Sequence, residues 1–158
     1  MAITQLVLLC RQGFEAETAA EIQDVATDAG CFGYCKTKTD QGWVSYVAED
    51  HQLKQMIEHV RFRNLIFARQ WFITGDVVEL DPQDRVTGVL ENMEGVPHCG
   101  ELEIVHADTN EGKELSRLCR SLTAPLAATL RKKAKLSAKR NSKIPRMMIL
   151  MLHGHEPL

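Results

Sequence analysis

The first 75 residues alternate between strand-like and helix-like patterns of apolar residues, and this order restricts the fold more than any other feature. An apolar run at residues 5–10 predicts a strand. Apolar residues then recur at steps of three to five positions up to Gly30, which predicts a helix because glycine is common just past a helix end. The residues of this apolar face are Phe14, Ala19, Ile22, Val25 and Ala29.

Two further strands, a second helix and a fourth strand complete this part of the chain. Residues 31–37 and 42–48 predict strands joined by a polar stretch, so we expect a hairpin. The second helix is indicated by Leu53, Met56, Ile57 and Val60. The largely apolar residues 65–73 predict a well-buried strand. The β-α-β-β-α-β order predicts an α+β fold in which residues 1–75 form a ferredoxin-like domain.

Residues 76–158 predict a second unit. Its first helix is expected to begin near Asp84 and to end before Gly95 and Pro97. The apolar positions of this helix are Val86, Val89, Leu90 and Met93. A strand is expected at residues 101–107, and Asp108 is the predicted N-cap of the helix that follows, with Glu111 in the capping-box position.

That next helix is amphipathic, with Lys113, Arg117 and Arg120 on the side opposite its apolar face. The apolar face comprises Leu115, Leu118, Cys119 and Leu122. Pro125 suits the first turn of a further helix, where its missing N–H is tolerated. Residues 147–152 predict a buried strand leading out to His153. The α-β-α-α-β order leaves a small sheet, so we expect the second unit to be incomplete.

The net charge of −2 conceals a strong division along the chain. Residues 76–114 hold eleven acids and two bases, whereas residues 131–146 hold eight bases and no acid. Such a local run is typical of a polyanion-binding protein. We therefore predict RNA contacts at Lys113, Arg117, Arg120, Arg131, Lys132, Lys133, Lys135, Lys139, Arg140 and Lys143, and Arg146 belongs to the same run.

Sites of other chemistry find little support. Cys31 and Cys35 would lie roughly 13 Å apart in a strand, which is too far for one zinc ion, and His98, His106, His153 and His155 add no zinc spacing. The five cysteines are expected to be reduced thiols in a cytoplasmic protein, because the short apolar run near the start predicts neither a membrane span nor a signal peptide.

Four patterns of RNA-binding, cofactor-binding or catalytic domains are also incomplete. Gly30 and Gly33 spell the GxxG of a KH domain, but the motif bridges a helix end and a strand. Trp43 and Tyr46 should point to opposite sheet faces, so they do not form the stacking platform of an RRM. No glycine-rich turn between a strand and a helix predicts a nucleotide-type cofactor, and no residues identify a catalytic triad, so we expect no catalytic residue in this chain.

Several stretches of the chain, taken in order, resemble the ribosomal RNA large subunit methyltransferase M family. They are LLCRQGFE at residues 8–15, AAEI at residues 19–22, LIFARQWF at residues 65–72, ADTNE at residues 107–111, KEL at residues 113–115, Pro125-Leu126 and Leu130-Arg131. The resemblance covers essentially the whole chain.

The resemblance implies a ferredoxin-like domain followed by a THUMP RNA-binding domain, at residues 1–75 and 76–158. In that family a Rossmann-like domain binds S-adenosylmethionine and methylates a cytidine ribose 2′-hydroxyl of 23S rRNA. The family's cofactor motif and catalytic lysine and acid residues have no counterpart here. We therefore expect a non-catalytic chain that binds 23S rRNA. The alternative is a ferredoxin-like interaction or ligand-sensing module without an RNA role.

Overall fold

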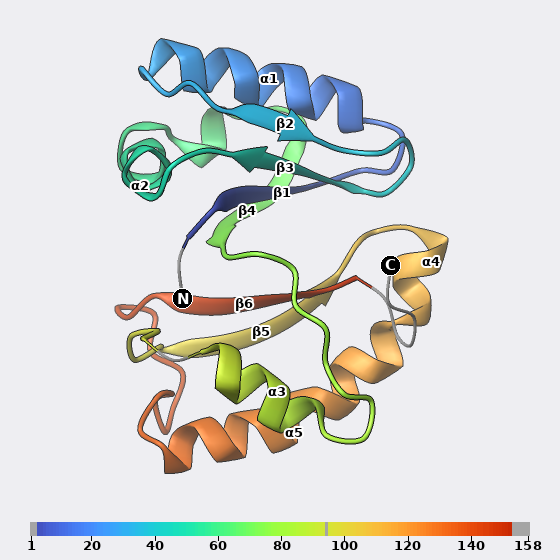
Figure 1. Ribbon diagram of the computed structural model, residues 1–158, viewed down its shortest axis with the longest axis vertical. Helices are drawn as coiled ribbons and strands as arrows, with labels where there is room; N and C mark the ends of the chain where they lie inside the picture. The colour runs from blue at the N-terminus through green and yellow to red at the C-terminus, as the bar shows by residue number, and fades with distance from the viewer. Residues whose placement is uncertain (1–2, 94, 153–158) are drawn as a thin grey trace. The chain divides into compact units, whose positions relative to one another are not determined.

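A computed structural model describes residues 3–93 and 95–152, which fall into two compact units (Figure 1). The first unit contains the residues up to Val77 together with Ala107–Thr109. The second contains Val78–His106 and the described residues from Asn110 onward. Within the described ranges no helix is long and apolar enough to cross a membrane.

The first unit has the predicted β-α-β-β-α-β order. Its elements are β1 (Gln5–Cys10), α1 (Glu15–Asp28), β2 (Tyr34–Lys36), β3 (Trp43–Val47), α2 (Asp50–His59), a 3-10 turn (Phe62–Asn64) and β4 (Ala68–Thr74). The strands form an antiparallel sheet of order β2-β3-β1-β4, so β2 and β4 are the edge strands. Leu6, Leu8 and Tyr46 on one sheet face pack with Ile22 of α1 and Met56 of α2 to form the core.

Two strands of this unit are shorter than the sequence predicts, for identifiable reasons. Residue 31 belongs to the end of α1: the Cys31 N–H donates to the Ala26 carbonyl and the Gly30 N–H to Thr27, around a left-handed Gly30. This pattern is a Schellman motif, so β2 begins only at Tyr34. The expected strand at residues 65–73 begins at Ala68, because the Glu21 carboxylate accepts the N–H groups of Ile66 and Phe67.

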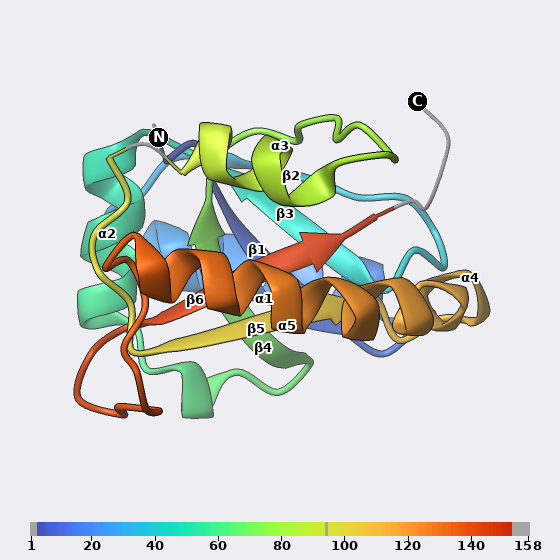
Figure 2. The ribbon, with the colours of Figure 1, turned by 90° about the horizontal axis from the view of Figure 1, so that it is seen from below.

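The second unit contains α3 (Arg85–Asn92), β5 (Glu101–His106), α4 (Asn110–Glu114), α5 (Ser116–Lys132) and β6 (Arg146–Met151). β5 and β6 pair in parallel, and α5 packs against β5 (Figure 2). Leu126 and Leu130 of α5 are fully buried, and they belong to one core with Val89 of α3 and with Met93, which directly follows α3. As predicted, the first helix begins close to Asp84. The structure adds that the Asp84 carboxylate accepts the Thr87 N–H as an N-cap.

Two expectations about the helices of this unit are wrong. Pro125 lies inside α5 rather than in the first turn of a separate helix, because the buried face containing Leu122, Leu126 and Leu130 continues on both sides of it. The helix expected after Asp108 begins at Asn110, so its N-cap position falls on Thr109. The Asp108 carboxylate accepts a hydrogen bond from Arg69 Nη1 at 2.5 Å.

Candidate nucleic-acid interface

The outer side of α5 carries a basic strip. Arg117, Arg120, Arg131 and Lys132 are exposed, and α5 contains no acidic residue. At 100° per residue these four positions fall within an arc of about 120°, opposite the buried side of the helix. Ser121, Ala124 and Ala128 lie between the two pairs, which are separated by roughly 16 Å along the axis. Such a strip can neutralise phosphates at two points without obstruction from large side chains.

Lys113 does not belong to this helix. It lies exposed on α4, a five-residue helix that ends at Glu114 before α5 begins at Ser116. The sequence prediction placed Lys113, Arg117 and Arg120 on one helical face, and that geometry is wrong because the two helices are separated at Leu115. Arg117 and Arg120 remain together on α5.

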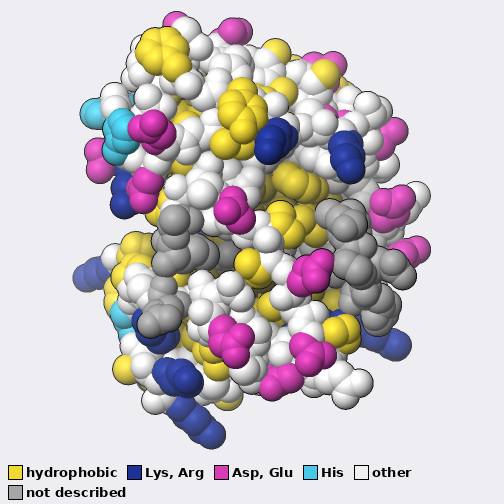
Figure 3. All heavy atoms as spheres, viewed as in Figure 1, with side chains coloured by type: hydrophobic (Ala, Val, Ile, Leu, Met, Phe, Trp, Pro, Cys, Tyr) yellow, Lys and Arg dark blue, Asp and Glu magenta, His cyan; other side chains and the backbone are white. Residues whose placement is uncertain are grey.

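The basic segment after α5 is held against the start of β5. The Cys99 N–H donates to the Lys135 carbonyl and the Ser137 N–H to the Cys99 carbonyl. The Gly100 N–H donates to the Pro145 carbonyl, and the Asn141 N–H returns to the Gly100 carbonyl. Figure 3 shows Lys and Arg side chains gathered at the end of the second unit where α5 gives way to this segment.

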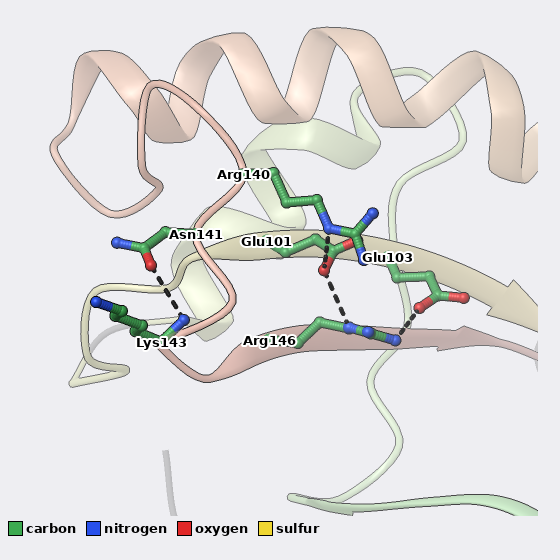
Figure 4. Close-up of polar contacts among 6 residues, drawn as sticks. All are labelled: Glu101, Glu103, Arg140, Asn141, Lys143 and Arg146. Carbon is green, nitrogen blue, oxygen red and sulfur yellow. Dashed lines mark hydrogen bonds and ion pairs between the residues drawn. The ribbon is translucent and has the colours of Figure 1, made fainter.

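Four of the eight basic residues in residues 131–146 make contacts inside the unit, and Figure 4 shows two of them, Arg140 and Arg146, beside Glu101 and Glu103. Arg140 Nε lies 3.2 Å and Arg146 Nε 3.3 Å from the same Glu101 oxygen, and Arg146 Nη1 lies 2.7 Å from Glu103. Lys135 Nζ donates to the Val96 carbonyl. Arg131 Nε donates to the Ser137 carbonyl. Glu101 and Glu103 therefore neutralise the charge of two arginines that the sequence left unpaired.

The remaining bases are exposed and have no ion pair within the described ranges. They are Lys132, Lys133, Lys139 and Lys143, together with Arg117 and Arg120 on α5. Six of the ten predicted RNA-contact residues are therefore basic side chains without an ion pair to a described residue. Of the other four, Arg131, Lys135 and Arg140 make contacts inside the unit and Lys113 lies on α4. Arg146, from the same basic run, is also ion-paired. The acids responsible were undetectable in the sequence, because the β5–β6 pairing that brings Glu101 opposite Arg146 links residues 45 positions apart.

Cysteine and metal chemistry have no support in the described part of the chain. All five cysteines are free, and burial raises the pKa of the Cys35 thiol to about 11. Burial also raises the pKa values of the Cys10, Cys31, Cys99 and Cys119 thiols, so these thiols stay protonated near neutral pH. No group of three or more potential metal ligands is found there, and His153 and His155 lie outside it.

The residues present do not fit S-adenosylmethionine. In residues 3–93 and 95–152, four connections lead from a strand into a helix, after β1, β3, β4 and β5. The first contains the single Gly13, whose N–H donates to the Glu15 carboxylate. The connection after β4 contains the single Gly75, and the connections after β3 and β5 contain no glycine. None of these four connections has the glycine-rich turn that lets backbone and cofactor approach closely.

Comparisons with known proteins match both parts of the chain. The family described as RlmM ferredoxin-like domain matches residues 3–72, and that described as ribosomal RNA large subunit methyltransferase M, N-terminal, matches residues 84–158.

Individual relatives carry the same name. A ribosomal RNA large subunit methyltransferase M of Aliivibrio salmonicida is 40% identical over 96% of this chain and 43% of its own length. Proteins of that name from Salmonella heidelberg and Shigella sonnei are 45% and 44% identical over 82% of this chain and 36% of their own length. The chain spans less than half the length of these relatives. It belongs to the ribosomal RNA large subunit methyltransferase M family and corresponds to the family's N-terminal region.

Proposed function

We propose that this chain is the RNA-binding N-terminal region of an S-adenosylmethionine-dependent methyltransferase that modifies a cytidine ribose 2′-hydroxyl of 23S rRNA. Residues 1–75 would be its ferredoxin-like domain and residues 76–158 a THUMP-like RNA-binding domain. The chain would hold rRNA for a catalytic Rossmann-like domain, in the cytoplasm. The names of the relatives and the match to the family support the assignment to rRNA methylation.

The observation that carries the RNA-binding role is the basic strip of α5. Arg117 and Arg120 at one end of the helix and Arg131 and Lys132 at the other are exposed on a helix without acids. Phosphate contacts of this kind give affinity and fix the position of RNA, but they read little sequence. The proposed role is therefore orientation: correct placement of the ribose hydroxyl near a methyl donor lowers the entropic part of the barrier.

Salt dependence tests the proposal most simply. If all six lysines and arginines without an ion pair contact phosphates, the slope of log affinity against log salt should be about −4 to −5. Fluorescence anisotropy with labelled fragments of 23S rRNA, titrated at several salt concentrations, measures this slope. A slope near zero, or no binding at low salt, would contradict the proposal and favour the ferredoxin-like interaction or ligand-sensing module.

A further inference from the structure

The first unit presents aromatic and basic side chains at the β2 edge of its sheet. The Cys35 side chain faces α1, where its Sγ lies 3.6 Å from the Ala19 carbonyl. Its neighbours Tyr34 and Lys36 therefore point to the other sheet face. Lys36 Nζ lies 5.6 Å from the centre of the Tyr34 ring. Figure 3 shows hydrophobic and Lys or Arg side chains next to each other over β2.

The backbone beneath these side chains is firmly anchored. Gly33 donates its N–H to Tyr46 Oη at 2.7 Å, and its carbonyl accepts from Gln23 Nε2 at 3.2 Å. A Cβ at position 33 would lie 2.2 Å from the Val47 carbonyl oxygen, so the close approach of this segment to β3 requires glycine. On either side of this anchored residue, Phe32 remains 74% exposed and Tyr34 54% exposed. Two large rings are thus displayed from a fixed backbone rather than from a loose loop.

The charge around the rings favours a polyanion. Residues 29–39 contain Lys36 and Lys38 and no acid, and neither lysine has an ion pair within the described ranges. Aromatic rings bind nucleobases by stacking, with lysines available for phosphates. Paired bases in a helix are stacked on one another, so free rings can reach only unpaired bases.

We propose that Phe32, Tyr34 and Lys36 form a binding surface for single-stranded RNA. The two rings stack on unpaired bases, and Lys36 neutralises a neighbouring phosphate. This inference rests on the proposed RNA-binding function but assigns a different contact: base stacking by the first unit, in addition to phosphate binding by α5. It also differs from the RRM pattern considered in the sequence, since Tyr46 is buried in the core and takes no part.

Titration with a labelled single-stranded oligouridine tests the surface. Removal of a stacking ring should weaken binding about 5- to 150-fold, so Phe32→Ala and Tyr34→Ala should each do so, while Tyr34→Phe should retain affinity. Lys36→Gln should reduce the salt slope by about 0.7, a change the ring variants should not produce. Ile66→Ala is the matched control, because Ile66 is 80% exposed in the same unit but precedes the opposite edge strand.

Photocrosslinking provides a readout that needs no variant. An oligouridine carrying 5-iodouridine should crosslink to Phe32 or Tyr34 of the wild-type chain, as identified by mass spectrometry. Unchanged affinity of both alanine variants, with no crosslink at either ring, would overturn the inference. If those variants instead abolished self-association in sedimentation experiments and left RNA binding intact, the surface would be a protein interface and the inference would be wrong.

The same experiments separate this inference from the proposed function. If Arg117→Glu with Arg120→Glu weakens binding of 23S rRNA fragments while the ring variants bind oligouridine normally, only the stacking surface is refuted. If the wild-type chain binds neither RNA, both proposals fail.

Discussion

Glu15 is a buried acid whose replacement should destabilise the first unit. Its side chain is only 3% exposed, and its carboxylate accepts the N–H groups of Gly13 at 3.1 Å, Asp40 at 3.1 Å and Gly42 at 2.9 Å. These bonds join the start of α1 to the β2–β3 turn. In Glu15→Gln one carboxylate oxygen is replaced by the amide NH2 group, which is a donor and cannot accept the backbone N–H that it faces. The lost charged hydrogen bond and the unsatisfied N–H should together cost about 2–4 kcal/mol.

The destabilisation should depend on pH with a defined sign. Burial raises the pKa of the Glu15 carboxyl, but hydrogen bonds from the N–H groups of Gly42, Glu15 itself, Asp40 and Gly13 together outweigh it, so the pKa lies below its usual range. A group with a depressed folded-state pKa stabilises the protein above its unfolded pKa of about 4.3. This stabilisation disappears as pH falls through the folded pKa, so wild type and Glu15→Gln should converge in acid.

Urea unfolding followed by circular dichroism at pH 7, 5 and 3 measures both effects. The neighbouring Glu17→Gln is the control, because Glu17 is exposed and also lies in the first turn of α1. It should change stability by less than about 1 kcal/mol. Equal stability of wild type and Glu15→Gln at pH 7, or a difference that persists unchanged at pH 3, would refute the account of this carboxylate.

Three further predictions concern the second unit and the cofactor. Pro125→Ala should stabilise the chain by about 1–2 kcal/mol in urea unfolding, because it restores an N–H inside α5; a loss of stability would show that proline is required there. Gly100→Ala should destabilise the unit and increase proteolysis within residues 133–145, since its Cβ would lie 2.2 Å from the Asn141 carbonyl oxygen; wild-type resistance would argue against this packing. The chain should show no stoichiometric S-adenosylmethionine binding by calorimetry and no methyl transfer, and micromolar binding would contradict this.

The element order of the first unit could be predicted because each element carries its own local pattern. Alternation in residues 42–48 and the helical spacing that includes Leu53 and Met56 require no knowledge of distant residues. Element ends were harder to predict. The N–H groups of Ile66 and Phe67 donate to the Glu21 carboxylate, and Glu21 lies 45 positions before Ile66. Nothing in the local sequence therefore indicates that β4 excludes these two residues.

The buried face of α1 shows a second limit of apolar periodicity. Phe14 was expected on that face but is 38% exposed, whereas Glu15 and Thr18 are buried. The Thr18 hydroxyl donates to the Phe14 carbonyl, and Glu15 accepts backbone N–H groups, so both polar side chains are satisfied in the interior. Hydrogen bonding to the backbone made burial favourable where hydrophobicity alone predicted exposure.

The candidate interface was predictable as a region but not as a set of residues. The charge run at residues 131–146 and the spacing of Arg117 and Arg120 identified it from the sequence. The partners of Arg140 and Arg146 depend on strand pairing, which the sequence does not reveal. Because α5 continues through Pro125, Arg131 and Lys132 lie on the same outer side as Arg117 and Arg120. The two helices expected from the sequence, with a new helix starting at Pro125, did not predict this arrangement.

Charge reversal on α5 tests the central claim most directly. Arg117→Glu with Arg120→Glu should weaken binding of 23S rRNA fragments and reduce the salt slope by about 1.4 to 1.8, since two phosphate contacts are lost. Lys54→Glu with Arg63→Glu changes the net charge equally on exposed residues of the first unit, and it should leave the slope close to that of wild type. Circular dichroism should show both variants folded. Equal slopes and affinities for the α5 variant and wild type would contradict the claim that α5 binds rRNA.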